Sequence, residues 1–524
     1  MNGILRHLRR FMRAAFPLVF ALAAGCSGLP GSGESTDADE SAAPDDWSTL
    51  RVELFDRNNT PLGAPPITDN FLAQYIQTHF GDPNRLKIEF VAVPRADEVE
   101  RLNVLMTANQ APDIVFTYDL PTVVNFATQG KIADLDGLLE THGQDLKALL
   151  GEDVLSAGRL NGIQYAIPAK RVLTAHSTTV IREDWLRELG LPLPETTEQF
   201  YEALKAFKEN IGGSSGERIV PYGHIDYYHT SSLQYSFWDW SRITEEDLYA
   251  SPRWAMPGNK EAFRFLNKLY HEGLIDPNFP LDRFAQQFQK DMASGRLGAG
   301  TPNTNEPVYM GYLAELQSND PNALLTPVDP FTNADGTKPK PVLEKNGMYI
   351  MIPKSSANAE AAVRYLNWMA QPETYLALQN GLEGVTYEWK DGVPVMLQTE
   401  DAKRMLHNYF DYCIILNGKW VSDENMRLNI RANAFDPDYE AFTVKSIEHG
   451  MNDGVATPQI QAIVPSEMQY AAILNEKNEE IFVEVVTAKP EEFDAVYDRE
   501  VSEYMRMGGQ AVMDEKRQAY RNRK

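Results

Sequence analysis

The chain has 524 residues, and 49 Lys and Arg against 74 Asp and Glu give it a formal net charge of −25. A chain of this length can bury the core of several domains or of one large two-lobed body, and two cysteines form at most one bridge, so a disordered chain and a disulfide scaffold are both excluded. The acidic balance argues against nucleic acid as a partner, because phosphate binding requires clustered Lys and Arg.

Residues 1–25 have the organisation of a secretory signal. Four arginines and no acidic residue precede a short apolar run over 14–24, which is too short for a comfortable membrane span. The run ends in LAAGC at residues 22–26, which resembles the lipobox of bacterial lipoproteins, with Ala23 where Leu is usual. We predict a signal peptide over 1–25 and a lipidated Cys26. An ordinary signal peptide with an incidental cysteine is the alternative.

Residues 26–47 are dominated by Gly, Ser, Pro and acidic residues. Such a composition cannot bury apolar surface, so we predict a flexible tether between the membrane and the folded body. If Cys26 is lipidated, Cys413 has no partner for a disulfide bond. Cys413 lies in an apolar run over 412–416, where we expect a small buried side chain and no nucleophile.

The folded body is expected to begin with strands that alternate with helices. Residue patterns predict strands over 50–55, 86–93 and 112–116, with helices between them. This order is typical of a βαβαβ unit and a largely parallel sheet. Because ligands of such sheets bind beyond the carboxyl ends of the strands, Tyr118 and Asp119 lie where a ligand would be met. A helix-entry turn is the alternative for both residues.

Polar residues mark the expected starts of helices. Asp69 is expected to cap a helix over 71–80, and Asp97 with Glu100 has the spacing of a capping box. The pair Asn161-Gly162 between apolar runs predicts a hairpin turn. Further amphipathic helices are expected over 196–209, 261–274 and 358–370.

Several short blocks then occur in a recognisable order. Together they resemble an extracellular solute-binding protein of a bacterial ABC importer, of the large lipoprotein branch that takes up oligosaccharides. Each block is weak alone, but jointly they extend from about residue 48 to the end of the chain. The blocks are 111–115, 161–168, 182–191, 272–277, 294–298, 361–368, 381–387 and 493–509.

The resemblance implies an α/β protein with the two-lobed fold of periplasmic binding proteins, in which hinge-connected lobes close on a ligand in a central cleft. We expect crossings between the lobes near 168–175, near 345–352 and around 370–390. The N-terminal lobe is expected to contain 48–168 and about 347–375, and the C-terminal lobe 169–346 and about 376–524.

The resemblance also implies a function without catalysis. The protein would capture an oligosaccharide or a related polyhydroxyl solute outside the cytoplasm and deliver it to ABC permease subunits. No cofactor and no nucleic acid are implied, the membrane is contacted only through the lipid on Cys26, and we expect a monomer. A secreted polysaccharide-acting enzyme is one alternative, because a chain with 74 acidic residues could contain a catalytic pair of carboxylates. A binding protein for peptides is another.

Aromatic residues are the first candidates for sugar contact, because rings stack on the apolar faces of sugars. Trp238 and Trp240 lie in the richest aromatic stretch, and on a strand they would share a face. Two core tryptophans are the alternative. Tyr387 and Trp389 follow the block at 381–384 and are expected to face the cleft from a crossing segment.

Polar candidates lie near the expected crossings. Lys170 and Arg171 lie just past Pro168, at the first predicted crossing, where a cation would pair with an acidic sugar or donate to hydroxyl groups. An interlobe salt bridge is the alternative. Asn303 and Asn305 follow an apolar segment and offer donors and acceptors to a ligand.

A loop at 210–217 departs from the resemblance. Many relatives carry there a calcium loop rich in Asp and Asn, built like an EF-hand. In this chain the loop has one carboxylate, Glu217, and no Asp. We therefore predict no metal at this loop.

Overall fold

The computed structural model describes residues 47–211, 218–223, 226–282, 285–422, 424–434, 436–460 and 462–523. The predicted signal peptide, Cys26 and the predicted tether up to residue 46 lie outside the described residues. So do residues 212–217 of the predicted metal-free loop, including Glu217. No helix in the described part of the chain is long and apolar enough to cross a membrane.

The first lobe is built on a mixed sheet. Strands β1 (Ser48–Asp56) and β2 (Leu86–Pro94) pair in parallel, with Ser48 opposite Leu86, which confirms both predicted strands. Val52 of β1 lies beside Ile114, just before the third predicted strand, β3 (Val115–Thr117). The remaining order is β3, β12 (Asn346–Met351), β6 (Ile167–Arg171) and β15 (Leu416–Asn417), with β12 antiparallel to both of its neighbours.

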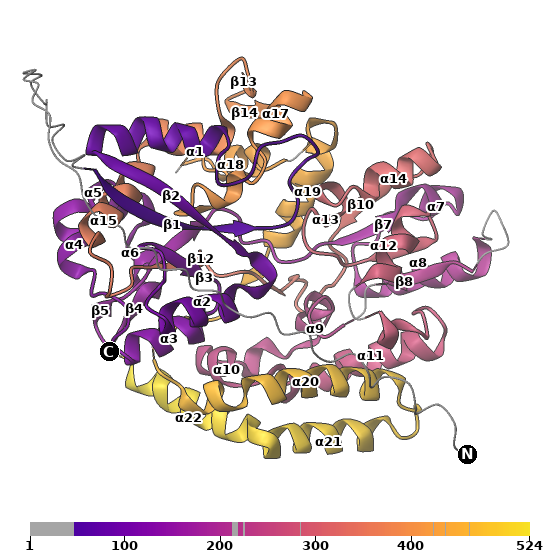
Figure 1. The fold of residues 1–524 in the computed structure, drawn as a ribbon. Coiled ribbons are helices and arrows are strands. Elements are labelled where there is room, and N and C mark those ends of the chain that lie inside the picture. The colour runs from indigo at the N-terminus through magenta and orange to yellow at the C-terminus, as the bar shows by residue number, and fades with distance from the viewer. Residues whose placement is uncertain are drawn as a thin grey trace, which may run out of the picture. The chain divides into compact units, whose positions relative to one another are not determined.

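Helices cover both faces of this sheet (Figure 1). Along β12, Met348 and Ile350 belong to one buried cluster, whereas Tyr349 and Met351 belong to another, as the alternation of side chains along a strand requires. The helices that contribute to these clusters are α1 (Phe71–Ile76), α2 (Glu98–Thr107), α3 (Leu120–Thr128), α4 (Asp136–His142), α5 (Gln144–Leu150), α6 (Glu152–Leu155), α15 (Ala359–Met369) and α16 (Pro372–Asn380).

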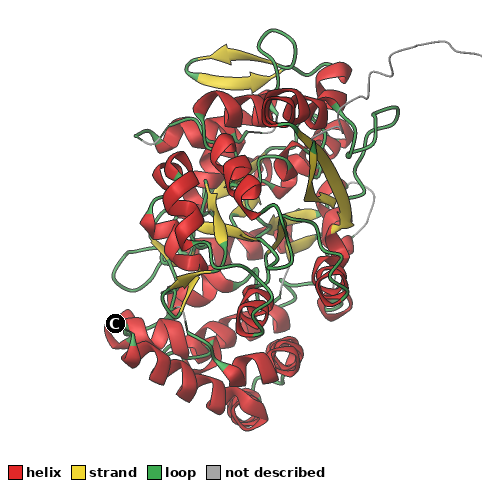
Figure 2. Cartoon of the chain, turned by 60° about the vertical axis from the view of Figure 1, so that its left-hand side comes forward, coloured by secondary structure: helices red, strands yellow, loops and turns green. Residues whose placement is uncertain are grey.

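The second lobe has its own four-stranded sheet. Its order is β10 (Leu325–Val328), β7 (Thr179–Arg182), β9 (Leu297–Gly300) and β8 (Val220–Gly223), and only β8 and β9 are parallel. Val180 and Ile181 point into different clusters, so helices bury both faces here as well. Figure 2 shows strands in the interior of the molecule with helices around them, and one two-stranded hairpin that protrudes at the top.

The second-lobe helices come from two separate stretches of chain. The C-terminal helices contribute Leu474, Phe482 and Phe493 to the same cluster as Ile181. The helices are α7 (Glu183–Glu188), α8 (Thr197–Asn210), α9 (Ser231–Phe237), α10 (Glu245–Ala250), α11 (Asn259–His271), α12 (Gln286–Ala293), α13 (Glu306–Tyr309), α14 (Tyr312–Asn319), α20 (Pro465–Thr487), α21 (Phe493–Tyr504) and α22 (Gln510–Asn522).

Three crossings connect the two sheets. The first crossing is 172–178, between β6 and β7, and the second is 329–345, between β10 and β12. The second contains β11 (Lys340–Pro341), which pairs with β16 (Gly454–Val455). The third crossing is 418–439, with α18 (Met426–Ala432), and leads to α19 (Glu440–Met451), which packs against β10.

The third crossing lies later in the chain than the predicted 370–390. Leu378 of α16 is buried in the first-lobe cluster, and so are Leu406, Ile415 and Trp420. The lobe boundary expected at residue 375 stays a prediction, and we propose to move it to about residue 420 on the basis of this packing.

Two of the expected helix caps differ in detail. Asn70, not Asp69, accepts a hydrogen bond from the Ala73 amide and caps α1. Asp97 precedes α2 but makes no side-chain cap bond, so the expected capping box does not form. The turn at Asn161-Gly162 is confirmed, since it connects β4 (Arg159–Leu160) and β5 (Ile163–Gln164) with both residues at positive φ.

Cys413 is expected to be inert in the folded protein. Its side chain is buried, which confirms the prediction, and burial raises the pKa of its thiol. In a chain with Cys26→Ser, a thiol reagent should label no cysteine in native buffer and one cysteine in guanidinium chloride. Rapid labelling of the native protein would contradict this.

Candidate functional site

The first-lobe wall of the candidate site lies at the carboxyl ends of three strands. Arg57 follows β1, Arg95 follows β2 and Tyr118 follows β3. The guanidinium carbon of Arg95 lies 4.7 Å from the centre of the Tyr118 ring and 5.2 Å from that of Phe55. Ligands of α/β sheets bind beyond these strand ends, so the wall offers an aromatic ring and cations to a ligand.

Two buried glutamates hold the end of β3. Glu98 accepts hydrogen bonds from the Tyr118 amide (3.2 Å) and the Thr117 hydroxyl (3.1 Å), and Glu53 accepts one from the Phe116 amide (3.3 Å). Burial raises the pKa of Glu53 to about 8, so its carboxyl group is protonated at neutral pH. Side chains from β1 and α2 therefore fix the backbone that carries Tyr118.

Arg57 is held by a residue from a distant part of the chain. Its Nε and Nη2 donate to Asp411 Oδ2 and Oδ1 at 2.7 and 2.8 Å, a bidentate pair. The Asp411 carboxylate is fully buried, and burial raises its pKa while Arg57 lowers it. The guanidinium of Arg57 thus compensates a buried negative charge.

Arg171, the last residue of β6, lies at the start of the first crossing and bonds to residues in or next to the other two. Its Nε donates to the carbonyl oxygens of Glu344 (3.0 Å) and Asn346 (3.2 Å), at the end of the second crossing. Its Nη1 donates to Oδ1 of Asn417 (3.2 Å), the last residue of β15 before the third crossing. Asn417 in turn donates to the Tyr118 hydroxyl (3.0 Å). One guanidinium therefore ties the segments that connect the lobes to the first-lobe wall.

The second-lobe wall contains Tyr228, which follows β8 and is 42 % exposed. The ring of His176, in the first crossing, lies 3.9 Å from the Tyr228 ring, centroid to centroid. Burial raises the pKa of the Tyr228 hydroxyl, and Arg171 and Arg253 oppose that rise, so this hydroxyl lies within electrostatic reach of both guanidinium groups. Tyr118 of one lobe and Tyr228 of the other thus both lie within electrostatic reach of Arg171.

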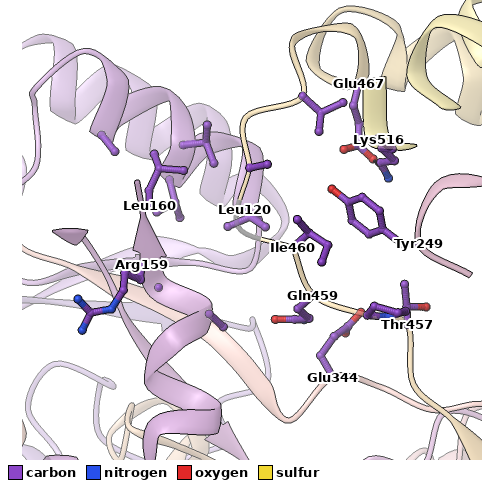
Figure 3. A pocket seen from close by; sticks show the side chains of 18 of the residues that line it. Leu120, Arg159, Leu160, Tyr249, Glu344, Thr457, Gln459, Ile460, Glu467 and Lys516 are labelled. Carbon is purple, nitrogen blue, oxygen red and sulfur yellow. Dashed lines mark ion pairs between the residues drawn. The ribbon is translucent and has the colours of Figure 1, made fainter. Parts of the chain in front are cut away.

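A cavity of about 250 Å³ also lies between the lobes (Figure 3). Its first-lobe side is α3 and the β4–β5 hairpin, and its second-lobe side is residues 457–460, 462 and 464 with Tyr249, Glu467 and Lys516. Lys516 and Glu467 form an ion pair at 2.5 Å on that side. Glu344, whose carbonyl oxygen accepts from Arg171, lines the cavity and connects it to the crossings.

The sequence of the chain matches one known protein family over more than half of its length. A family model described as bacterial extracellular solute-binding protein matches residues 65–375, more than half of the chain. The chain belongs to this family. The description of the family is one of solute binding, as the resemblance in the sequence implied.

Relatives of this solute-binding protein span most of its length. It is 24 % identical over 432 residues to the lipoprotein LipO of Bacillus subtilis, covering 79 % of this chain and 82 % of LipO. It is 21 % identical over 467 residues to the polygalacturonan/rhamnogalacturonan-binding protein YtcQ of the same organism, covering 84 % and 86 %.

A solved structure supports the two-lobed fold. This is an EF-hand mutant of FusA, an ABC-transporter substrate-binding protein of S. pneumoniae, in complex with fructo-nystose. The TM-score is 0.64 at 16 % identity, over 90 % of this chain and 99 % of the FusA chain. At this identity the likeness establishes the fold alone.

Tyr118 and Arg171 are the expected residues that the structure brings together at the crossings. Asp119 lies next to them, but its carboxylate accepts from the Thr122 amide and caps α3, which is the helix-entry alternative. Lys170 precedes Arg171 on β6, so its side chain points to the opposite face of the strand. There its Nζ lies 3.8 Å from the centre of the Trp420 ring and donates to the Leu149 carbonyl. We do not include Asp119 or Lys170 in the proposed site.

Trp238 and Trp240 of the solute-binding protein lie within the second lobe, at the end of α9 and not on a strand. Trp238 is buried, and its indole nitrogen donates to Asn259. The Trp240 indole donates to the Tyr235 carbonyl. Both line a cavity of about 710 Å³ whose wall also includes residues 332–335 of the second crossing, where Asn333 donates to the Trp238 carbonyl oxygen. Tyr118, Arg171 and Tyr228 do not line this cavity.

Asn303 reaches the first crossing, since it pairs with Ser177, but its side chain donates to Glu306 at 2.9 Å. Asn305 is buried at positive φ and precedes α13. Asn303 therefore lies at the edge of the candidate site, and Asn305 lies beneath the surface.

Tyr387 and Trp389 lie on the hairpin of β13 (Tyr387–Lys390) and β14 (Val393–Met396), near α17 (Glu400–Met405) at the top of Figure 1. Tyr387 is buried and Trp389 is exposed. The hairpin packs on α18 and belongs to no crossing.

Sequence reasoning missed Arg57, Arg95 and Tyr228. All three follow a strand, so the rule that selected Tyr118 would have found the first two once applied to β1 and β2. No local signal marks Asn417 or Asp411, which reach the site through long-range folding. In the described part of the chain, no three His, Cys, Asp or Glu residues gather as metal ligands would.

Proposed function

We propose that this protein is the extracytoplasmic binding component of an ABC importer, and that it captures an oligosaccharide between its lobes for delivery to a membrane permease. The observation that carries the proposal is the position of Arg171, which lies at the start of the first crossing, bonds to residues in or next to the other two, and is within electrostatic reach of Tyr118 of one lobe and Tyr228 of the other. A solute bound there would contact both lobes and the hinge together.

The chemistry of the site suits a sugar. Tyrosine rings offer faces to the C–H groups of a sugar ring, and Arg and Asn offer donors to its hydroxyl groups. Relatives with stated ligands, YtcQ and FusA, bind polysaccharide or oligosaccharide. Closure of the lobes around such a solute would give the permease a two-state signal.

Removal of either tyrosine ring is expected to weaken oligosaccharide binding. Tyr118→Ala and Tyr228→Ala should each raise the dissociation constant about tenfold or more, because each loses one stacking surface. Binding is measured by calorimetry after a thermal-shift screen of neutral and acidic oligosaccharides, in which a ligand raises the melting temperature by mass action.

The matched control is Trp47→Ala, an exposed aromatic residue at the opposite, amino end of β1. The Trp47→Ala variant should bind the oligosaccharide with the same affinity as the wild type. If no oligosaccharide raises the melting temperature, the proposed function fails. Mass spectrometry of the sugar after incubation should find it unchanged, and product release would favour the enzyme alternative instead.

We also propose that Cys26 is lipidated and anchors the protein to the membrane, with residues 26–47 as the tether. The support is the LAAGC sequence at 22–26 and the name of the relative LipO, a lipoprotein. In cells given a labelled fatty acid, the wild-type protein should carry label and the Cys26→Ser variant should not.

A further inference from the structure

Arg171 carries a positive charge that no carboxylate neutralises among the described residues. Its hydrogen bonds go to two carbonyl oxygens and one amide oxygen. A guanidinium stays charged at any physiological pH and has five N–H donors, whereas the bonds at Arg171 use only Nε and Nη1. Its Nη2 donates to no described residue. A charged, partly used donor group therefore lies at the junction of the lobes.

The direction of this group is fixed before any ligand binds. The Glu344 and Asn346 carbonyls hold its Nε, and Asn417 holds its Nη1, so the fork of N–H groups is pre-organised. A pre-organised fork loses little side-chain entropy on binding and suits the two oxygens of a carboxylate.

Arg253 is a second such cation within electrostatic reach of Tyr228. Its Nη1 donates to the Tyr227 carbonyl at 2.9 Å, and its guanidinium carbon lies 3.8 Å from the centre of the Tyr227 ring. It forms no ion pair with a described residue. Arg57 and Arg95 differ, because Asp411 and Glu98 pair with them.

The carboxylates near Tyr228 do not cancel these charges by contact. Asp226 pairs with His229 at 2.7 Å, and Glu344 forms no ion pair with any described residue. Burial, with His229 and Arg253 nearby, lowers the pKa of His176 to about 3, which agrees with a locally positive environment. Such a region is unusual in a chain with a net charge of −25, and it would attract anions to this place.

We propose that the solute is an acidic oligosaccharide, and that Arg171 binds the carboxylate of a uronic acid residue at its free Nη2 side while the rings of Tyr118 and Tyr228 contact the sugar. Arg253 contributes a second positive charge to the same region. This inference rests on the proposed function and narrows it to a substrate class.

The test compares sugars that differ only in charge. Trimers of galacturonate, of mannuronate and of guluronate are titrated into the wild-type protein by calorimetry, beside the methyl ester of each trimer. We expect at least one free acid to bind about 100-fold tighter than its ester, because a carboxylate–guanidinium pair is lost in the ester. The affinity should also fall with added salt.

Variants locate the effect. Arg171→Lys should weaken binding of the free acid about tenfold or more and leave binding of the ester nearly unchanged, since Lys keeps the charge but lacks the planar fork. Arg253→Gln should likewise weaken binding of the free acid more than binding of the ester. Arg264→Gln, an exposed second-lobe arginine paired with Glu261 and Asp494, is the control and should change neither affinity.

The outcomes separate the two proposals. If neutral oligosaccharides or esters bind as tightly as the acids, the inference is overturned and the proposed function stands. If neither acidic nor neutral oligosaccharides bind, both fail. The comparison of acid with ester uses the wild-type chain alone, so a folding defect in the Arg171 variant cannot decide the result.

Discussion

Replacing Arg57 with Met is expected to lower the free energy of unfolding by about 3–5 kcal/mol, because it leaves the buried carboxylate of Asp411 without its partner. Loss of Arg57 also removes the influence that lowers the pKa of Asp411 against burial. The folded-state pKa of Asp411 then lies further above the unfolded value, so the stability of the variant falls as pH rises from the unfolded pKa toward the folded one. Urea unfolding at several pH values measures both effects.

A second substitution in the same pair tests this explanation. Asp411→Asn added to Arg57→Met should recover part of the loss, since the uncompensated charge is gone. Arg427→Met is the control, because Arg427 and Glu448 form an exposed pair, for which about 1 kcal/mol or less is expected. A loss for Arg57→Met as small as that of the control would show that the Asp411 carboxylate is solvated.

Replacing Lys419 with Met is expected to raise the free energy of unfolding at pH 7 by about 3 kcal/mol. Lys419 is buried in the third crossing, with its Nζ 5.0 Å from the centre of the Tyr409 ring, and it makes no ion pair with a described residue. Burial lowers the pKa of Lys419 to about 8. This pKa lies about 2.5 pH units below the ordinary pKa of Lys, and each unit corresponds to roughly 1.4 kcal/mol. Burial of the charged ammonium group therefore destabilises the folded protein by about 3 kcal/mol at pH 7.

The sign of the pH dependence is specific to this residue. Below pH 8 the lysine is charged in both states, and the folded state bears the full cost of burying the ammonium group. Between about pH 8 and 10.5 the unfolded chain binds more protons, so wild-type stability rises with pH. The advantage of Lys419→Met should therefore shrink over this range.

Lys345→Met is the matched control, because Lys345 forms an exposed pair with Asp153. It should change the free energy of unfolding little at any pH. Equal stability of the wild type and Lys419→Met at pH 7 would contradict a buried, uncompensated ammonium group at Lys419.

Elements that are marked by a local residue pattern were predictable. Alternation located β1 and β2, and the Asn161-Gly162 pair located the β4–β5 hairpin, because both signals depend on local backbone chemistry. Competition between neighbouring residues was harder to judge. Asn70 and Asp69 are both good caps, and only the Tyr412 hydroxyl, which donates to Asn70, distinguishes them.

The candidate site was predictable in part for the same reason. Tyr118 and Arg171 were found because each ends a strand or lies at an expected crossing. Asn417 completes the contact between them from about 250 residues further along the chain than Arg171, and no local pattern announces it. The spacing of Trp238 and Trp240 assumed a strand, whereas the chain leaves α9 there and buries Trp238 against Asn259.

The strand order also bears on the sequence of events during synthesis. The sheet of the second lobe is complete once residue 328 has emerged, whereas β12, which separates β6 from β3, follows only at 346–351. The first lobe is synthesised first, but its strands β3 and β6 stay unpaired until β12 has been made. The second lobe can already pair its own strands at that stage. Long-range pairing of this kind is slow and leaves open edges exposed, so a chaperone that holds the nascent chain would protect residues 48–171 above all.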